Sequence, residues 1–292
     1  MVKRAQSGNG IVIVFIIIVI AIVGYLYYSG FFSKLSLESA NQTQNIIPIG
    51  MSVSSPDQLG SLYPSQQFHV VSMITNNGTR PFTVSLLPYG CPTRDSAINV
   101  MVYPGTSDPV QWNFTAPSSG GCDIQFTACF NDVSYADYPV IVKNQSTSAT
   151  PPVFPTASVA PISLSIPGFS STVLAPPVPA NITEYIRAVD IGNGFVSNGT
   201  TEGYLAWLDL NVQGANAYIQ LANSIAKTSP NINVTSSVLL AFAPNGGALQ
   251  LPFLLTVNPV SSQSGYYGGM NINISSGYRY CIQSQFLPVS TT

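Results

Sequence analysis

Charged side chains are scarce in this chain of 292 residues. Nine Lys and Arg and eleven Asp and Glu make up only 7% of the sequence, and the formal net charge is −2. Phosphate recognition needs clustered cations, so nucleic acid is not expected as a partner. The sequence contains no long run of like charges, which excludes an acidic or basic tail.

Residues that carry chemistry are also few, with one His and four Cys. His69 lies between Phe68 and Val70, and no second His is present to complete a catalytic dyad or a copper site. A Ser nucleophile would need a base, and no Lys lies in a recognisable motif. The sequence therefore predicts no catalytic residue, no cofactor, no metal site and no enzymatic activity.

Three Asp residues lie in turn-like segments. Asp132 and Asp137 bracket the segment DVSYAD, and Asp190 begins DIGNG. Carboxylate oxygens in such turns can bind Ca²⁺, or the turns can simply be solvated. We expect solvated turns.

A long apolar run stands near the N-terminus. Residues 11–28 contain no charge, and eighteen helical residues cover about 27 Å, close to the hydrocarbon thickness of a bilayer. Lys3 and Arg4 precede the run, which predicts a cytoplasmic N-terminus and an extracellular remainder. A cleaved secretory signal is the alternative, but its apolar region would be shorter and would end in small residues. We expect an uncleaved transmembrane anchor, or one cleaved ahead of the apolar run.

The segment ahead of this run resembles the class III signal peptides of archaeal type IV pilins and related surface proteins. The resemblance rests on Lys3-Arg4-Ala5, then Gln6-Ser7, then the apolar helix, and it covers about 30 residues. It implies cleavage between Ala5 and Gln6, with the helix packed into a filament core or held in the membrane. The scarcity of charge also resembles surface proteins of thermoacidophilic archaea, because few carboxylates bind protons when the pH falls.

The presumed exterior is rich in N-x-Ser/Thr triplets, the acceptors of N-linked glycans. Eight such triplets occur, about double the roughly four that the composition alone would give. The two interpretations are a glycosylated exterior and a chain that is simply rich in Asn, Ser and Thr. The triplets begin at Asn41, Asn77, Asn113, Asn144, Asn181, Asn198, Asn233 and Asn273.

The four cysteines are expected to form disulfides in an exported chain. We favour a Cys91–Cys122 bond, with Cys129 and Cys281 left over or paired across domains. A zinc site is not expected, because no C-x-x-C pair or nearby His completes one.

The remaining sequence predicts a mainly β protein, with the transmembrane helix followed by two immunoglobulin-like β-sandwich domains. In DIQFTACF, Ile124, Phe126, Ala128 and Phe130 share one parity, which predicts a half-buried strand. We expect a leader at 1–10, a membrane helix at 11–32, a stalk at 33–65, a first sandwich at 66–143, a Pro-rich linker at 144–180 and a second β domain at 181–292.

Three further features lie in the second half. The segment 215–227 is expected to be a helix, since Tyr218, Leu221, Ala222 and Ile225 fall on one helical face. In the linker, ISLSI could pair as an edge strand. The C-terminal tyrosines are either core residues or an exposed surface for sugars or a neighbouring subunit, and we favour the core. They are Tyr266, Tyr267, Tyr278 and Tyr280.

These features predict a single-pass extracellular glycoprotein with a structural or adhesive role, of which a pilin-like filament subunit is the sharpest version. Its expected partners are membrane lipid and either copies of itself or other envelope proteins. An exposed edge strand could add to a strand of a neighbouring subunit. The alternative is a ligand- or receptor-binding surface protein of a cell or virion, or an accessory subunit of a membrane complex.

Overall fold

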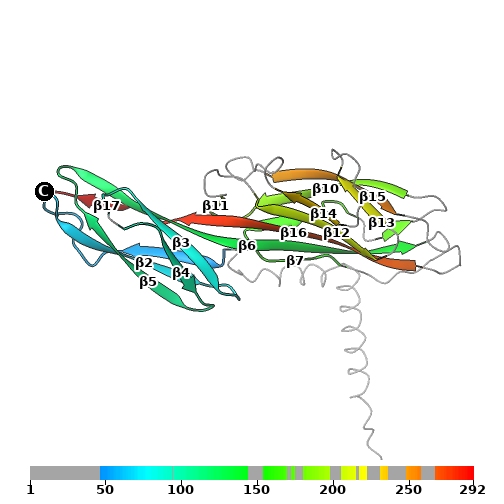
Figure 1. Cartoon of the computed structure of the whole chain (residues 1–292), viewed down its shortest axis with the longest axis horizontal. Coiled ribbons are helices and arrows are strands. Elements are labelled where there is room, and N and C mark those ends of the chain that lie inside the picture. Colours follow the sequence, from blue (N-terminus) through cyan, green and yellow to red (C-terminus); the bar gives the residue numbers. More distant parts are fainter. Residues whose placement is uncertain are drawn as a thin grey trace, which may run out of the picture. The chain divides into compact units, whose positions relative to one another are not determined.

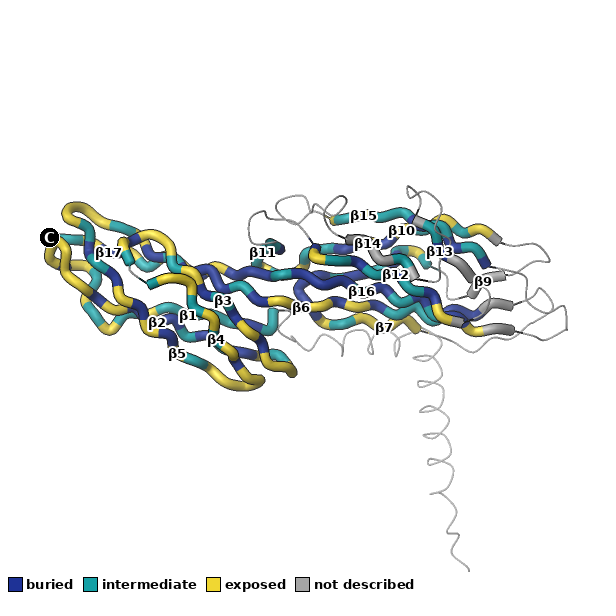
Figure 2. The backbone as a smooth tube through the Cα atoms, viewed as in Figure 1, coloured by how far each residue is buried: buried dark blue, intermediate teal, exposed yellow. Residues whose placement is uncertain are grey.

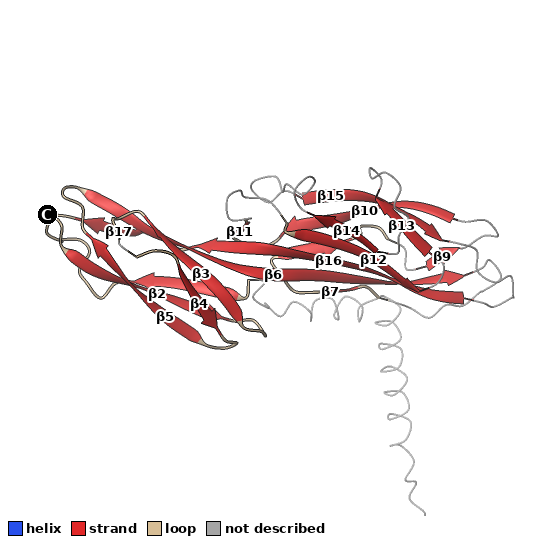
Figure 3. Ribbon diagram, viewed as in Figure 1, coloured by secondary structure: helices blue, strands red, loops and turns tan. Residues whose placement is uncertain are grey.

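Alternating apolar and polar side chains produce strands wherever the chain is described, and the described residues contain no helix (Figure 3). The computed structural model describes residues 47–93, 95–143, 154–169, 172–174, 180–197, 205–214, 217–221, 231–235, 248–257 and 267–292. The fold is therefore mainly β with several sheets, as predicted. The predicted leader and membrane helix, at 1–10 and 11–32, lie outside the described residues.

The first sheet has three antiparallel strands in the order β1-β2-β5. These strands are β1 (Ile49–Ser54), β2 (Gln67–Asn76) and β5 (Ser107–Thr115). Every second residue of β2 points inward, from Phe68 to Asn76, which is the period of a strand with one buried face. Ser72 can be buried in this row because the Trp112 indole N–H donates to its hydroxyl at 2.8 Å.

A ten-stranded sheet is the largest element, and its main path runs β14-β12-β16-β6-β3-β4 (Figure 1). The strands of this path are β14 (Asn231–Thr235), β12 (Trp207–Gly214), β16 (Tyr267–Gln283), β6 (Gly121–Lys143), β3 (Phe82–Tyr89) and β4 (Ile98–Val102). Shorter strands pair beside them: β7 (Thr156–Ala157), β9 (Thr172–Leu174), β11 (Phe195–Val196) and β17 (Leu287–Ser290).

Aromatic contacts join the three-stranded sheet to one end of the large sheet. The Phe126 ring of β6 lies 5.3 Å from that of Trp112 and 6.1 Å from that of Phe114, both on β5. Ile124, Phe126, Ala128 and Phe130 are all buried, so the predicted inward face of this segment is confirmed (Figure 2). The two sheets therefore face each other as a sandwich with an aromatic interior.

A four-stranded sheet faces the other end of the large sheet. Its order is β13-β15-β10-β8, from strands β13 (Ala217–Leu221), β15 (Ala248–Val257), β10 (Ala180–Asp190) and β8 (Ile162–Ser165). The Ser134 hydroxyl of β6 donates to the Ile162 carbonyl of β8 at 2.5 Å. The expected strand in ISLSI is confirmed as β8, and its Ile162 and Leu164 are buried.

Strand pairing crosses the boundary that we predicted between two domains. All of β16, from the predicted second domain, pairs with β6, from the predicted first domain. Strand β8, from the predicted linker, pairs with β10. Residues 45–292 form one compact unit. Strand β6 continues from the region where the three-stranded sheet packs on the large sheet into the region where the four-stranded sheet packs on it. We call these the two packing regions.

Two local predictions were wrong. The segment that includes Asp132 and Asp137 is not a turn but the middle of β6, because Asp132, Ser134 and Ala136 continue its buried row. Residues 217–221 are strand β13 instead of part of a helix. These residues are extended because they pair with β15, and this arrangement buries the Ile219 side chain.

Candidate interaction site

Strand β1 forms one edge of the three-stranded sheet, because among the described residues it pairs with β2 alone. Its sequence IGMSVS contains no charged residue and no Pro. Proteins commonly protect an edge strand with such residues, and β5 at the opposite edge carries Asp108 and Pro109. Strand β1 therefore presents an unprotected row of backbone donors and acceptors.

The register of β1 determines which backbone groups lie on its open side. The Asn77 amide donates to the Pro48 carbonyl at 2.7 Å, so residues 48 and 77 are a hydrogen-bonded pair. Such pairs alternate along an antiparallel ladder. The backbone N–H and C=O groups of Ile49, Met51 and Val53 therefore point away from β2, toward the side on which another strand could add.

A groove of about 460 Å³ lies beside the first half of β1. Its apolar residues include the buried Ile49 and the half-exposed Ile191, and amides at its rim include Asn193 and Gln283. The remaining lining residues are Ile47, Gly50, Met51, Asn77, Gly192 and Ile282. A peptide extended along β1 would find backbone partners on the strand, and the groove would receive one of its side chains beside Ile49 and Met51.

One wall of the groove is the turn from Asp190 to Gly194, which Tyr280 of β16 holds in place. The Tyr280 hydroxyl donates to Asp190 Oδ1 at 3.0 Å and accepts from the Gly194 amide at 2.9 Å. Gly192 also donates to Asp190 Oδ1 at 3.0 Å. A Cβ at Gly192 or Gly194 would overlap the Tyr280 side chain, so this wall requires glycine. Burial raises the pKa of Asp190 and of Tyr280.

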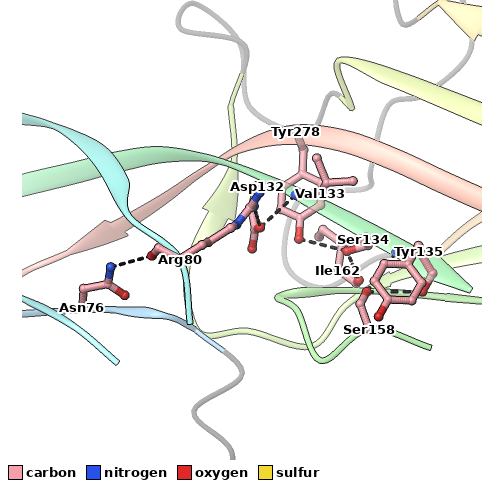
Figure 4. A network of polar contacts seen from close by, with 9 residues as sticks. All are labelled: Asn76, Arg80, Asp132, Val133, Ser134, Tyr135, Ser158, Ile162 and Tyr278. Atoms are coloured by element: carbon pink, nitrogen blue, oxygen red, sulfur yellow. Dashed lines mark hydrogen bonds and ion pairs between the residues drawn. The ribbon is translucent and has the colours of Figure 1, made fainter. Parts of the chain in front are cut away.

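The turn that carries Asn77 is held by an interior network (Figure 4). Asn76 Nδ2 donates to the Arg80 carbonyl at 2.8 Å, and the Arg80 guanidinium forms an ion pair with Asp132 of β6. Asp132 Oδ1 also accepts from the Val133 amide at 2.8 Å. Burial raises the pKa of the Asp132 carboxyl, although these partners lower it.

Tyr278 extends the network to a second sheet. Its hydroxyl lies 2.9 Å from Ser134 Oγ, which bonds the Ile162 carbonyl. Burial and the neighbouring Asp132 carboxylate raise the pKa of Tyr278. The side chains of Tyr278, Ser134 and Asp132 are buried, so this network stabilises the interior and offers no binding surface.

Both cysteine pairs are disulfide-bonded. The favoured Cys91–Cys122 bond is confirmed, and Cys129 and Cys281, left open by the sequence, bond to each other. The second bond joins directly opposite residues of β6 and β16.

The described glycan acceptors lie in different environments. Asn77, Asn113 and Asn181 are exposed, in a turn and on strands β5 and β10. Asn273 lies in β16 between β12 and β6, and its Oδ1 is buried without a hydrogen-bond partner. The backbone of Asn233 lies in β14. Asn41, Asn144 and Asn198 are outside the described residues, as are Ala5 and Gln6.

The C-terminal tyrosines are core residues where their side chains are described. Tyr278 is 2% exposed and Tyr280 is 0% exposed, so the favoured core interpretation is confirmed for these two. Tyr266 lies outside the described residues, and Tyr267 begins β16.

The sequence predicted one strand-like stretch, IIPIGMSVS, inside a stalk at 33–65, but it did not predict the groove beside that strand. The available signal was the alternation of Ile49, Met51 and Val53 with small residues, which is typical of a half-buried strand. The turn at 190–194 was predicted from DIGNG, but its contact with Tyr280 was not, since Tyr280 is remote in sequence.

No family model and no curated protein matches the chain. A crystal structure of red sea bream transglutaminase is similar at 10% sequence identity and a TM-score of 0.23; the match covers 84% of this chain and 31% of that one. A similarity this weak carries no argument about function.

The described part of the chain contains no helical segment with the length and hydropathy of a membrane span. The same residues hold no group of three or more His, Cys, Asp or Glu side chains suited to a metal ion.

Proposed function

We propose that this chain is a membrane-anchored extracellular glycoprotein with a structural or adhesive role, assembling with copies of itself through the open edge of β1. The observation that carries the proposal is the uncharged, Pro-free edge of β1 beside a groove lined by both aliphatic side chains and amides. An extended segment of a second copy would add as a strand there, with backbone hydrogen bonds supplying affinity and the groove supplying selectivity.

The charge balance supports association between copies. A net charge of −2 on 292 residues gives little repulsion between identical chains. Addition of one copy's segment to another copy's edge is a head-to-tail contact, which generates a filament when the rotation does not close. A pilin-like filament subunit is the specific form of this proposal.

The two disulfides support an extracellular location, because such bonds persist in oxidising compartments. The exposed acceptors Asn77, Asn113 and Asn181 are compatible with a glycosylated surface. The proposal includes an anchor helix at 11–32, cleavage between Ala5 and Gln6, and sandwiches of the immunoglobulin type. It assigns no reaction to the chain, since one His and eleven carboxylates supply little acid–base chemistry.

Substitution of Val53 by Pro tests assembly. The Val53 amide points to the open side of β1, so proline removes a donor needed by an incoming strand while keeping the bonds to β2. We expect the full chain in mild detergent to form filaments or large oligomers, and Val53→Pro to reduce them about tenfold or more. Electron microscopy and sedimentation measure the assembled fraction.

Val53→Thr is the matched control, because it retains the amide and a β-branched side chain. We expect it to assemble like the unaltered chain, with similar thermal unfolding for all three proteins. A chain that remains monomeric at every concentration, or Val53→Pro assembling normally, would contradict the proposal. The N-terminal residue of the mature protein tests the leader separately: Gln6 supports cleavage, and Met1 contradicts it.

A further inference from the structure

The outer face of the large sheet, opposite its buried face, carries rows of aligned polar and aromatic side chains. Paired residues on neighbouring antiparallel strands share a face. One row is Asn211–Asn273–Asp137, and the next is Asp209–Ser275–Tyr135, each running across β12, β16 and β6. The third row is Trp207–Gly277–Val133. We call these nine residues the outer patch.

Trp207 forms a flat platform at one end of the outer patch. Its ring lies over Gly277 so closely that a Cβ on that glycine would overlap the indole. One ring face is therefore turned to the sheet, and the partly exposed side chain directs the other outward. Tyr135 and Val133, which are 50% and 39% exposed, lie beside this platform on β6.

Two amide oxygens without partners lie on β16, two and three rows along the sheet from the platform. Asn273 Oδ1, and Asn271 Oδ1 two residues earlier on β16, are buried and accept no hydrogen bond. An unpaired buried acceptor carries a desolvation penalty. Rotation of the amide exchanges its oxygen with its NH₂ group, which lets each side chain offer an acceptor to a hydroxyl above the sheet.

We propose that the outer patch binds a neutral oligosaccharide. The Trp207 ring stacks on the apolar face of one sugar ring, and the amides and carboxylates of the other two rows bond hydroxyls of the adjoining sugar rings. Aromatic surface next to acceptors and donors is the combination that a sugar requires, because each sugar ring has apolar C–H faces and a polar rim.

The charges of this face favour a neutral ligand. Asp137 and Asp209 disfavour an anion, while Arg279 lies on the same face two residues beyond Gly277. The described residues hold no group of three or more His, Cys, Asp or Glu side chains suited to a metal ion, so a Ca²⁺ site is the less favoured interpretation. The proposal does not depend on assembly at β1.

Tryptophan fluorescence provides a direct test on the full chain. The sequence has two Trp residues, and Trp112 is 0% exposed, so acrylamide reaches mainly Trp207. Trisaccharides of glucose, mannose, galactose and N-acetylglucosamine are titrated to millimolar concentrations. We expect at least one to protect Trp207 from quenching. We expect Tyr135→Ala to weaken that protection about two- to tenfold, the loss of one aromatic contact.

Asn273→Ala separates binding from folding. It removes an unpartnered oxygen, so we expect unchanged or higher thermal stability together with weaker sugar binding. Tyr63→Ala, at a residue 73% exposed and outside the outer patch, should bind as the unaltered chain does. Val53→Pro should also bind normally, which distinguishes failure of this proposal from failure of assembly.

Three results would overturn the proposal. In the first, no trisaccharide protects Trp207. In the second, Tyr135→Ala and Asn273→Ala both bind as tightly as the unaltered chain. In the third, Ca²⁺ alone protects the residue, reversibly with a chelator, while the sugars do not, which would make the outer patch a cation site.

Discussion

Individual buried polar residues hold turns and strands together in this protein, and Asn76 is one of them. Asn76, which is 0% exposed, donates to the Arg80 and Val102 carbonyls and accepts from the Gly78 amide. Its side chain therefore provides hydrogen-bond partners for the backbone of Gly78 and Arg80, in the turn that carries Asn77. Removal of such a side chain leaves its partners unpaired in the interior, which costs more than the bond itself contributes.

Buried and partly buried carboxyls make stability depend on pH in a defined direction. Burial raises the pKa of Asp132, Asp190 and Asp209 above the ordinary 3.8. The folded state therefore binds protons more tightly than the unfolded state. The resulting stabilisation is complete below the ordinary pKa and is lost as the pH rises through the raised values.

Asp132→Asn tests this linkage. The amide cannot ionise, so the variant does not gain the stability that protonation of Asp132 gives the unaltered chain. We therefore expect the unfolding free energy of the unaltered chain to exceed that of the variant by more at pH 4 than at pH 7. At pH 7 the difference should stay within about 1 kcal/mol, because the half-exposed Arg80 can be hydrated when its partner is lost. Urea denaturation at both pH values measures it. Asp123→Asn, at an exposed residue, is the control, and parallel pH curves for Asp132→Asn would contradict the argument.

At the scale of elements, turns position the strands that they connect. Gly90 follows β3 and precedes the disulfide-bonded Cys91, with a φ of 104°. A Cβ there would overlap the Asp123 carbonyl, in the strand that also carries Cys122. The close approach of the two backbones at the disulfide therefore depends on glycine.

Gly90→Ala combines left-handed strain with a backbone clash, and we expect it to lower the unfolding free energy by about 3 kcal/mol. Gly105→Ala is a matched control, because Gly105 also has a positive φ, of 73°, but nothing lies within 4 Å of its Cβ position. Strain alone should cost about 1 kcal/mol there. Thermal and urea denaturation of both variants measure the difference, and equal losses would show that the clash is relieved by a small shift.

The sequence predicted individual strands better than their extent. The alternation in DIQFTACF was sufficient to identify the inward face of the first part of β6. Its continuation was missed because Asn131, Asp132 and Asp137 are typical of turns. Asp132 and Ser134 tolerate burial through Arg80 and Tyr278, which lie 52 and 144 residues away in sequence. The β1 groove was missed for the same reason, since its walls come from three remote segments.

At the scale of the whole unit, β6 and β16 are the elements that unite the packing regions. One hydrophobic cluster includes Phe126 and Trp112 near the three-stranded sheet and Phe253 and Leu255 in the four-stranded sheet. The period of a strand predicts which residues are buried but not which sheet covers them. Two separate domains were therefore predicted where long shared strands connect the sheets.

The two disulfides close loops of very different length, and their contributions to stability should differ accordingly. Cys91–Cys122 spans 31 residues and Cys129–Cys281 spans 152. Loop-closure entropy gives about 4 kcal/mol for the first bond and about 5 kcal/mol for the second. The loops do not overlap in sequence, so we expect the effects to add. The paired variants Cys91→Ala with Cys122→Ala, and Cys129→Ala with Cys281→Ala, test this ranking by urea denaturation.

The second pair has a further effect because its bond joins the two strands that run through both packing regions. We expect the Cys129→Ala and Cys281→Ala pair to destabilise the whole unit, with tryptophan fluorescence and circular dichroism reporting the same lowered midpoint. The Cys91→Ala and Cys122→Ala pair serves as the comparison, since both pairs replace bonded cysteines by the same residue. A larger loss for the shorter loop would mean that local packing around Gly90, and not chain entropy, sets the contribution of these bonds.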